Sequence, residues 1–325
     1  MIELTPGENG EPEKREVMFD WDVVIIGGGP AGLSAGLYLS RANHRTILLD
    51  NESFGGYIKN VEWIENYPGF AEGISGAMLS SQMVTQATNY GLKLELAEVT
   101  GIENFSSSRF VTCSDGNGYT TGVVIIAGGC RPRKLGVPGE DSLEGKGVFS
   151  CALCDGGEFA DRVVAVCGGG DAAVIEALYM TKLASKVILL VEAGHELRAT
   201  AVLRDRALAN PKLEIRREIN IEAITGDNRV EAIELLDMTN GRKESLKVDG
   251  VLIHIGMDPN TNYFDGVVPI NDEGQIIVND RMETEVPYLL AAGDIRSGSP
   301  RQIVTAVGDG ATAAISAQRL LQELE

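Results

Sequence analysis

The sequence predicts an α/β protein that contains two nucleotide-binding βαβ units. The prediction comes from two glycine-rich loops, at 27–32 and 168–173, because each follows an apolar strand-like run and precedes a helical pattern. A pair of cysteines, Cys151 and Cys154, stands between the two loops. Together these features predict an electron path that connects two dinucleotide sites with a dithiol.

The first unit is expected to be a strand, a helix and a second strand, at 22–26, 33–41 and 46–49. Gly27, Gly29 and Gly32 match the pattern G-x-G-x-x-G. In this pattern the first glycine makes the turn, the second lets the backbone approach a pyrophosphate, and the third lets helix and strand pack closely. Asp50 closes the second strand, where a carboxylate can accept hydrogen bonds from a ribose. A purely structural tight turn is the alternative.

The second unit repeats this order, with a strand, the glycine turn, a helix and a strand at 162–167, 168–173, 174–183 and 186–191. Gly168, Gly170 and Ala173 occupy the motif positions. Further elements are expected outside the two units, namely strands at 123–129 and 288–292 and a final helix at 303–321. The repetition indicates two nucleotide domains or one duplicated domain.

Length, charge and cysteine content limit the classes of function. A chain of 325 residues is long enough for two domains, and its formal net charge of −19 argues against a nucleic-acid or anionic-membrane partner. The sequence has no apolar run long enough to span a membrane. Residues 1–20 are polar and acidic and are expected to form a flexible lead without a secretory signal. Five cysteines are too few for a disulfide scaffold, so a cytoplasmic protein with one catalytic pair is expected.

The Cys151–Cys154 pair is expected to be redox-active. A Cys-x-x-Cys at the start of a turn or helix can lower one thiol pKa and form an exchangeable disulfide. Asp155 follows directly and can move a proton to a departing thiolate. A zinc half-site or a structural pair are the alternatives, and no metal is expected. The other three cysteines are expected to be small buried hydrophobic residues: Cys113, Cys130 and Cys167.

The end of the strand after the second loop bears on the choice of nicotinamide nucleotide. Selection of a 2′-phosphate needs arginines near this position, but the strand ends with Glu192, and Arg198 follows six residues later. A carboxylate repels a phosphate and can bind a bare 2′-hydroxyl. The sequence therefore favours NADH over NADPH, with an unused loop as the alternative.

With these motifs in place, residues 21–321 resemble a low-molecular-weight thioredoxin reductase of the FAD-dependent pyridine nucleotide-disulfide oxidoreductases. The resemblance depends on the order and spacing of six motifs: GGGPAG at 27–32, ENYPGF at 65–70, CALCDG at 151–156, GGGDAA at 168–173, AAGD at 291–294 and RQ at 301–302. It implies two Rossmann-like, three-layer ββα domains, the second inserted in the first. The FAD domain would comprise 21–132 and 259–325, and the nicotinamide-type domain with the dithiol 133–258.

The resemblance also implies roles for single residues. Cys154 would face the flavin, Cys151 would attack the partner disulfide, and Asp155 would be the acid/base. The residues expected to bind FAD, in addition to the loop and Asp50, are Pro30, Ala31, Gly55, Gly56, Tyr57, Asn66, Gly293, Asp294, Arg301, Gln302 and Ile303. A homodimer, and a rotation of one domain against the other during the cycle, are implied in the same way.

Three departures from the family pattern bear on donor and partner. Val191-Glu192-Ala193 replaces the His-Arg-Arg that binds the 2′-phosphate, and Gly157-Glu158 replaces an aromatic pair that helps to dock thioredoxin. Tyr57 replaces the glutamine of Gly-Gly-Gln beneath the flavin, where it would pack on the ring or be an ordinary tyrosine.

The sequence thus predicts an FAD-dependent reductase of thioredoxin or a related protein disulfide, with a donor other than NADPH. Three alternatives remain open. They are a reductase fed by ferredoxin, an oxidase that passes electrons from a small-molecule dithiol to oxygen, and a non-enzymatic flavin redox sensor.

Overall fold

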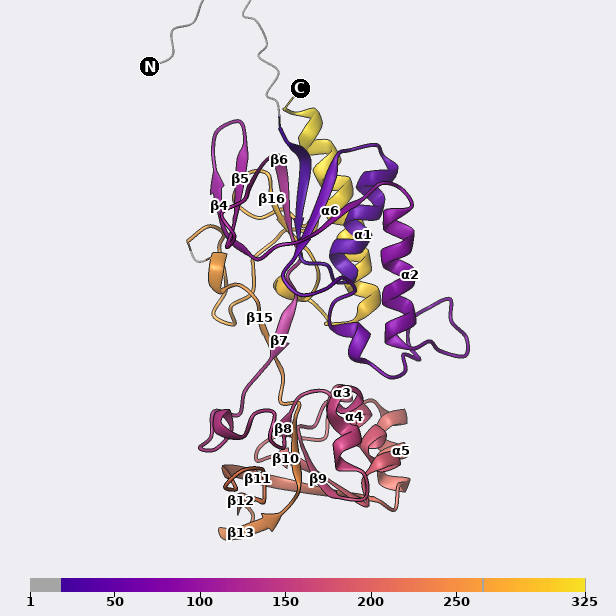
Figure 1. The fold of residues 1–325 in the computed structure, drawn as a ribbon, viewed down its shortest axis with the longest axis vertical. Helices are drawn as coiled ribbons and strands as arrows, with labels where there is room; N and C mark the ends of the chain where they lie inside the picture. Colours follow the sequence, from indigo (N-terminus) through magenta and orange to yellow (C-terminus); the bar gives the residue numbers. More distant parts are fainter. Residues whose placement is uncertain (1–18, 265, 325) are drawn as a thin grey trace, which may run out of the picture. The chain divides into compact units, whose positions relative to one another are not determined.

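A computed structural model describes residues 19–264 and 266–324. The chain forms two compact units (Figure 1). The first contains the described residues of Met1–Gly56, Met78–Gly129 and Pro259–Glu325, and the second contains Tyr57–Ala77 and Cys130–Asp258. Most of the N-terminal lead expected at 1–20 lies outside the described residues.

A seven-stranded sheet is the centre of the first unit. Its main path has the order β3-β2-β1-β6-β5-β4, and β16 pairs with β6. The strands β1, β2, β3, β6 and β16 are parallel, whereas β4 and β5 add antiparallel pairs at one edge. The bounds are β1 Trp21–Ile26, β2 Thr46–Asp50, β3 Lys93–Leu96, β4 Val99–Asn104, β5 Arg109–Cys113, β6 Gly118–Ile126 and β16 Leu289–Ala291.

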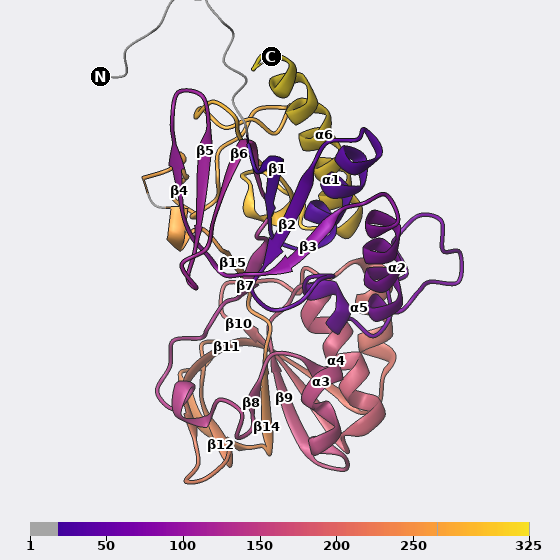
Figure 2. The same cartoon turned by 45° about the horizontal axis from the view of Figure 1, so that its top comes forward.

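Helices cover one side of this sheet, as Figures 1 and 2 show. They are α1 Pro30–Arg41, α2 Gly76–Thr88 and α6 Ile303–Gln322. The strands β1 and β6 end in the apolar runs 23–26 and 123–126, which contribute to hydrophobic clusters on both faces of the sheet, as expected for a buried parallel sheet. Helices α1 and α6 pack closely, because a Cβ on Gly310 would lie only 2.1 Å from the Ala31 carbonyl oxygen.

The second unit has its own seven-stranded sheet, with the order β13-β12-β11-β10-β9-β14-β8. Its bounds are β8 Val148–Phe149, β9 Val163–Cys167, β10 Lys186–Glu192, β11 Leu213–Thr225, β12 Ala232–Asp237, β13 Arg242–Lys247 and β14 Gly250–Ile253. The helices are α3 Ala152–Asp155, α4 Asp171–Leu183 and α5 Ala201–Ala209. The strands β8 to β11 and β14 are parallel, and β9, α4 and β10 form the strand-helix-strand unit predicted around the second glycine loop.

Two short strands, β7 Cys130–Pro132 and β15 Met257–Pro259, pair where the chain passes between the units. Short 3₁₀ helices complete the structure: η1 Tyr57–Asn60, η2 Asp141–Leu143, η3 Gly156–Phe159, η4 Asn262–Phe264 and η5 Gly293–Ile295. The segment Tyr57–Ala77, which the sequence resemblance assigned to the FAD domain, makes its contacts with the second unit. Ion pairs of Glu62 with Lys182 and of Glu65 with Arg206 contribute to this attachment.

The predicted elements are present in the structure, and the helices of the two glycine units start three residues earlier than expected, whereas α6 starts at Ile303 as expected. Helix α1 starts at Pro30 and not at residue 33, because proline is favoured at the first helical position and Gly29 caps the helix in an extended conformation. Helix α4 starts at Asp171 and not at residue 174, with Gly170 as its cap. In each unit the helix therefore begins within the glycine loop that follows the strand, at the carboxyl end of β1 or β9.

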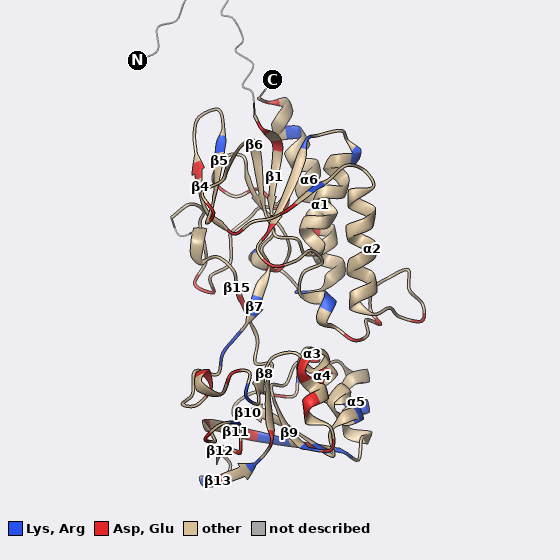
Figure 3. Cartoon of the chain, viewed as in Figure 1, with Lys and Arg blue, Asp and Glu red and all other residues tan. Residues whose placement is uncertain are grey.

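Acidic residues are spread over both units and do not gather on one element, as Figure 3 shows. No helix among residues 19–264 and 266–324 is long and apolar enough to cross a membrane.

Candidate functional site: two glycine loops and a disulfide

The first glycine loop is shaped by contacts that exclude larger residues. Gly27 has φ +108°, and a Cβ there would lie 2.3 Å from the Ala127 carbonyl oxygen. A Cβ on Gly32 would lie 1.9 Å from the Gly27 carbonyl oxygen. A Cβ on Gly29, in contrast, would have only the Gly56 Cα nearby, at 3.9 Å. The loop is therefore closed toward the sheet and open above Gly29, where a pyrophosphate would lie against the start of α1.

Asp50 is fixed at the end of β2 by main-chain amides. Its Oδ2 accepts a hydrogen bond from Gly28 N at 2.7 Å, and its Oδ1 accepts one from Ser53 N at 3.0 Å. The sequence did not indicate Tyr263, whose side chain interacts electrostatically with Asp50. Burial, and next the Asp50 charge, raise the pKa of Tyr263 to about 12. A Cβ on Gly128 would lie 3.0 Å from the Tyr263 hydroxyl. Asp50 thus has the position and orientation of a ribose acceptor, with a protonated tyrosine nearby.

Gly55 and Gly56 lie against the first loop. Gly55 N donates to the Gly28 carbonyl at 2.8 Å, and a Cβ on Gly56 would lie 2.7 Å from the Gly29 Cα. This contact brings together two segments that the sequence separates by more than 20 residues.

The short helix η5 brings a carboxylate, Asp294, to the same unit. Gly293 lies against α1, because a Cβ there would be 2.9 Å from the Ala31 Cβ. The adjoining Asp294 accepts a hydrogen bond from Ser299 at 3.2 Å, and burial raises the pKa of its carboxyl group. Arg301 has a left-handed backbone with φ +56°. Its positive charge lowers the pKa of the Asp294 carboxyl group and so partly offsets the larger effect of burial.

Gln302 caps α6, and Ile303 is the first residue of that helix. The residues of the first unit fit an FAD: a glycine cradle, a fixed carboxylate for a ribose, and a second carboxylate on η5. Asn66 and Tyr57, expected in the same set, belong to the segment that contacts the second unit.

The two cysteines of the second unit form a disulfide, Cys151–Cys154, at the start of α3. Cys151 is the N-cap residue, and its Sγ accepts a hydrogen bond from Cys154 N at 3.1 Å. Asp155 ends this short helix. Burial, and next the Glu158 charge, raise the pKa of the Asp155 carboxyl group. The arrangement places an acid with an elevated pKa at the residue that follows Cys154.

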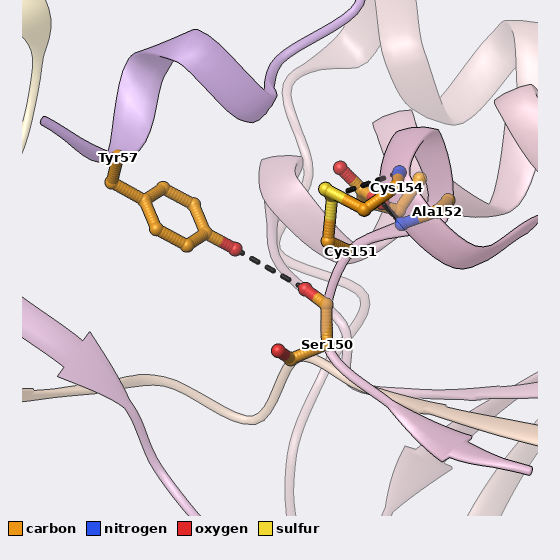
Figure 4. The surroundings of a disulfide bond; sticks show 6 residues. Tyr57, Ser150, Cys151, Ala152 and Cys154 are labelled. Atoms are coloured by element: carbon orange, nitrogen blue, oxygen red, sulfur yellow. Dashed lines mark hydrogen bonds between the residues drawn. A yellow bond between two sulfur atoms is a disulfide. The ribbon is translucent and has the colours of Figure 1, made fainter. Parts of the chain in front are cut away.

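The main chain on either side of Cys151 is held by side chains. The Tyr57 hydroxyl donates to the Ser150 carbonyl at 3.3 Å, beside the disulfide (Figure 4). His254 forms a hydrogen bond with the same Ser150 main chain, although burial lowers the pKa of its imidazole to about 4. On the other side, Glu176 Oε2 accepts a hydrogen bond from Ala152 N at 2.6 Å. The sequence had indicated Tyr57 as a flavin neighbour and neither His254 nor Glu176.

The second glycine loop repeats the geometry of the first. Gly168 has φ +137°, and a Cβ on it would lie 2.2 Å from the His254 carbonyl oxygen and 3.0 Å from the Ala173 Cβ. A Cβ on Gly170 would meet nothing within 4 Å. Asp171 Oδ1 accepts a hydrogen bond from Thr200 N at 2.6 Å, so the stretch after β10 folds back onto the loop. The loop keeps an open glycine at the position that a second dinucleotide needs.

The end of β10 carries more charge than Glu192 alone. The Glu192 side chain is 65% exposed, and its Oε2 lies 3.8 Å from His195 Nε2. The guanidinium of Arg198 contacts the Nδ1 atom of the same imidazole. Arg198 thus contacts the imidazole that lies beside Glu192, and its positive charge partly offsets the negative charge of that carboxylate.

The other three cysteines, Cys113, Cys130 and Cys167, are not part of a disulfide. Cys113 and Cys167 are buried as expected, but Cys130 is only half-buried, because β7 pairs with a single short strand. Among the residues that the structure describes, no three His, Cys, Asp or Glu side chains are grouped to hold a metal ion.

Comparison with known proteins shows the family of the chain. A sequence model of the pyridine nucleotide-disulphide oxidoreductases matches residues 21–310. The thioredoxin reductase of Bacillus subtilis (strain 168) is 42% identical over 306 residues, which cover 94% of this chain and 96% of that protein. Among solved structures, Lactococcus lactis thioredoxin reductase aligns with a TM-score of 0.91 at 36% identity, covering 94% of this chain and 100% of that one. The T. acidophilum thioredoxin reductase aligns with a TM-score of 0.87 at 32% identity, covering 93% and 98%.

Membership of this family implies FAD and a nicotinamide nucleotide as cofactors, and disulfide reduction by a flavin-dependent oxidoreductase. The chain belongs to the pyridine nucleotide-disulphide oxidoreductases and, within them, to the low-molecular-weight thioredoxin reductases.

Proposed function

We propose that the protein passes two electrons from a donor other than NADPH, through FAD and the Cys151–Cys154 disulfide, to the disulfide of thioredoxin or a related protein. The observation that carries this proposal is the closed disulfide at the start of α3 with Asp155 as the next residue. Bound FAD would supply the two-electron relay between donor and disulfide. In the first unit, the loop at 27–32, Asp50 and Asp294 would hold its phosphates and ribose.

The chemistry after reduction belongs to the two cysteines and one acid. Cys151 Sγ, as a thiolate, attacks one sulfur of the partner disulfide, which breaks that S–S bond and forms a mixed disulfide. Cys154 Sγ then attacks Cys151 Sγ, which restores the internal disulfide and releases the partner as a dithiol. Asp155 acts as the acid/base that exchanges a proton with Cys154, and its raised pKa suits this role. Two electrons and two protons pass to the partner in each cycle.

NADH is the donor that the second unit favours. The glycine at 170 is open and β10 ends at Glu192, which can accept hydrogen bonds from a bare ribose. A 2′-phosphate at this place would meet a carboxylate. The nearby His195 and Arg198 reduce this repulsion, so discrimination against NADPH is expected to be about tenfold and not absolute.

The deciding experiment is anaerobic. The purified yellow protein is mixed with NADH, NADPH or reduced ferredoxin, and the loss of flavin absorbance is followed. Rapid bleaching by NADH supports the proposal. Rapid bleaching by NADPH contradicts the donor assignment, and bleaching by ferredoxin alone identifies a ferredoxin-dependent reductase.

Cysteine variants separate the two halves of the path. Cys151→Ser and Cys154→Ser should each abolish reduction of a protein disulfide and leave bleaching by the donor largely intact. Cys130→Ser, which changes a half-buried cysteine outside the disulfide, is the matched control. Because Cys154 is the sulfur assigned to the flavin side, Cys151→Ser should also show a long-wavelength charge-transfer band. Turnover retained in both variants would show that the pair is structural.

We also propose a homodimer, as expected for this family. Light scattering should then give twice the chain mass of 34.7 kDa.

A further inference from the structure

Glu176 is a buried carboxylate for which the reaction described above has no role. It lies on α4 with 9% of its surface exposed, and its Oε2 atom is bonded to Ala152 N at 2.6 Å. Burial of a charge is costly, and apart from burial the strongest influences on its pKa are this amide and a second carboxylate, Glu62. The chain thus keeps a carboxylate where an apolar residue would pack at lower cost.

The contact places this carboxylate in the first turn of the disulfide helix. Ala152 lies between the two cysteines, and its amide is taken by Glu176. Two residues further along the same turn, Cys154 N donates a hydrogen bond to Cys151 Sγ. The carboxylate and the sulfur therefore accept hydrogen bonds from two amides of one turn, and a negative charge on the first opposes a negative charge on the second.

Reduction of the disulfide creates such a charge. Two electrons break the S–S bond, and near neutral pH one sulfur takes up a proton from solvent while the other remains partly a thiolate. We propose that Glu176 is a positioning residue of the disulfide, whose carboxylate fixes the Ala152 amide and whose charge lowers the reduction potential of the Cys151–Cys154 pair. A lower potential makes the dithiol a stronger reductant toward the partner disulfide.

This inference rests on the proposed function, since it assigns a potential to a disulfide that turns over. The role assigned to Glu176 is not that of a proton donor, because its Oε2 atom accepts a hydrogen bond from an amide. The charge acts at pH 8, above the Glu176 pKa of about 7.

The test measures the potential of the pair directly. Holoprotein is equilibrated without oxygen at pH 8 in mixtures of reduced and oxidised dithiothreitol and then trapped with a maleimide. The peptide that contains Cys151 and Cys154 is quantified by mass spectrometry, which keeps the other three cysteines out of the measurement.

Two variants separate charge from contact. Glu176→Gln removes the charge and keeps an oxygen that can accept from Ala152 N. Glu176→Asp keeps the charge, but its shorter side chain withdraws from that amide. Glu65→Gln is the matched control, because it removes a carboxylate of the same unit that pairs with Arg206 on α5. Glu176→Met is a second neutral variant that fills the buried volume if the glutamine variant does not fold.

Glu176→Gln is expected to shift the equilibrium toward the dithiol by about tenfold, equivalent to about +30 mV for a two-electron couple. Glu176→Asp and Glu65→Gln are expected to stay within about threefold of wild type. A wild-type potential in Glu176→Gln, or a shift confined to Glu176→Asp, overturns the inference and leaves the proposed function standing. A wild-type disulfide that dithiothreitol cannot reduce and reoxidise contradicts the proposed function itself.

Discussion

The hydroxyl of Tyr57 donates a hydrogen bond to the carbonyl of Ser150, the residue that precedes the first redox cysteine. The relationship joins η1 to the disulfide segment across 93 residues of sequence. It also gives Tyr57 a partner that is main chain, at a position where the family pattern suggested a contact with flavin.

Removal of the hydroxyl in Tyr57→Phe should reduce the free energy of unfolding by no more than about 1 kcal/mol, because the bond is long and Ser150 is exposed. Burial and the Glu176 charge raise the pKa of Tyr57 from 10.0 to about 12, so the hydroxyl is protonated in both the folded and the unfolded protein below pH 9, and the difference should be the same at pH 6 and pH 9. Urea unfolding at both pH values checks this, with Tyr38→Phe on α1 as the control. A loss that disappears by pH 9 would contradict the assignment of Tyr57 as a donor.

Asp155→Asn should reduce turnover of a protein disulfide on the order of 10²-fold or more, as expected when a general acid is lost. Wild-type turnover should fall as pH rises above the raised Asp155 pKa. Because the Glu158 charge helps to raise that pKa, Glu158→Gln should move this fall to lower pH. Asp161→Asn, on the same unit, should leave the pH profile unchanged. An unchanged profile in Glu158→Gln would show that Asp155 is not the group that titrates.

Glu192→Arg should shift the preference from NADH toward NADPH by about tenfold or more. Two like charges at ~4 Å repel by about 4 kcal/mol at an effective dielectric constant near 20, and exposure to solvent reduces this value. The change is best confined to Glu192 and Ala193, because Val191 is 1% exposed and a histidine there would be buried. Ratios of kcat/KM for the two nucleotides measure the shift, with Glu231→Arg as the control. Efficient use of NADPH by wild type would contradict the role of Glu192.

Two buried groups should act on stability in opposite directions of pH. The Glu176 pKa is raised from 4.5 to about 7, so its contribution is present below pH 4.5 and is lost as pH rises through 7. The His254 pKa is lowered from 6.5 to about 4, so its contribution is present above pH 6.5 and is lost as pH falls through 4. Each contribution is about 3 kcal/mol, and between pH 4.5 and pH 6.5 the two slopes cancel.

Variants should uncover these slopes. Relative to wild type between pH 4.5 and pH 6.5, the free energy of unfolding should rise with pH in Glu176→Gln and fall with pH in His254→Gln, each by about 1.4 kcal/mol per pH unit. Urea unfolding at half-unit steps of pH measures both. Parallel curves for the two variants would show that neither group is shifted by the fold.

Local patterns were enough to predict the glycine loops, their strands and helices, and the redox cysteines. These features depend on residues a few positions apart, as in the approach of Gly32 to Gly27. The side chains that the sequence did not indicate act over long separations. Glu176 accepts a hydrogen bond from the amide of Ala152, 24 residues earlier in the sequence. Tyr263 is affected by the charge of Asp50, which is more than 200 residues away in the sequence.

Arg109 illustrates the same limit within the core. A charged residue in an alternating strand is expected to face solvent, yet Arg109 is 1% exposed. Its guanidinium lies 4.0 Å from the centroid of the Tyr288 ring and donates to the Gly122 carbonyl at 2.8 Å. Only the folded arrangement of β5, β6 and the loop before β16 creates these acceptors, so no local pattern could indicate them.

The long insertion leaves and re-enters the first unit at adjacent points, because Asn260 N donates to the Gly129 carbonyl at 3.0 Å. The two ends of the insertion are therefore hydrogen-bonded neighbours. A linker of a few glycines between these residues would close the chain without stretching the sheet, so the first unit can be produced as a shortened protein that keeps its glycine cradle and both carboxylates. If the first unit holds FAD as proposed, the shortened protein would bind the cofactor in the absence of the dithiol, and its measured potential would be that of the flavin alone.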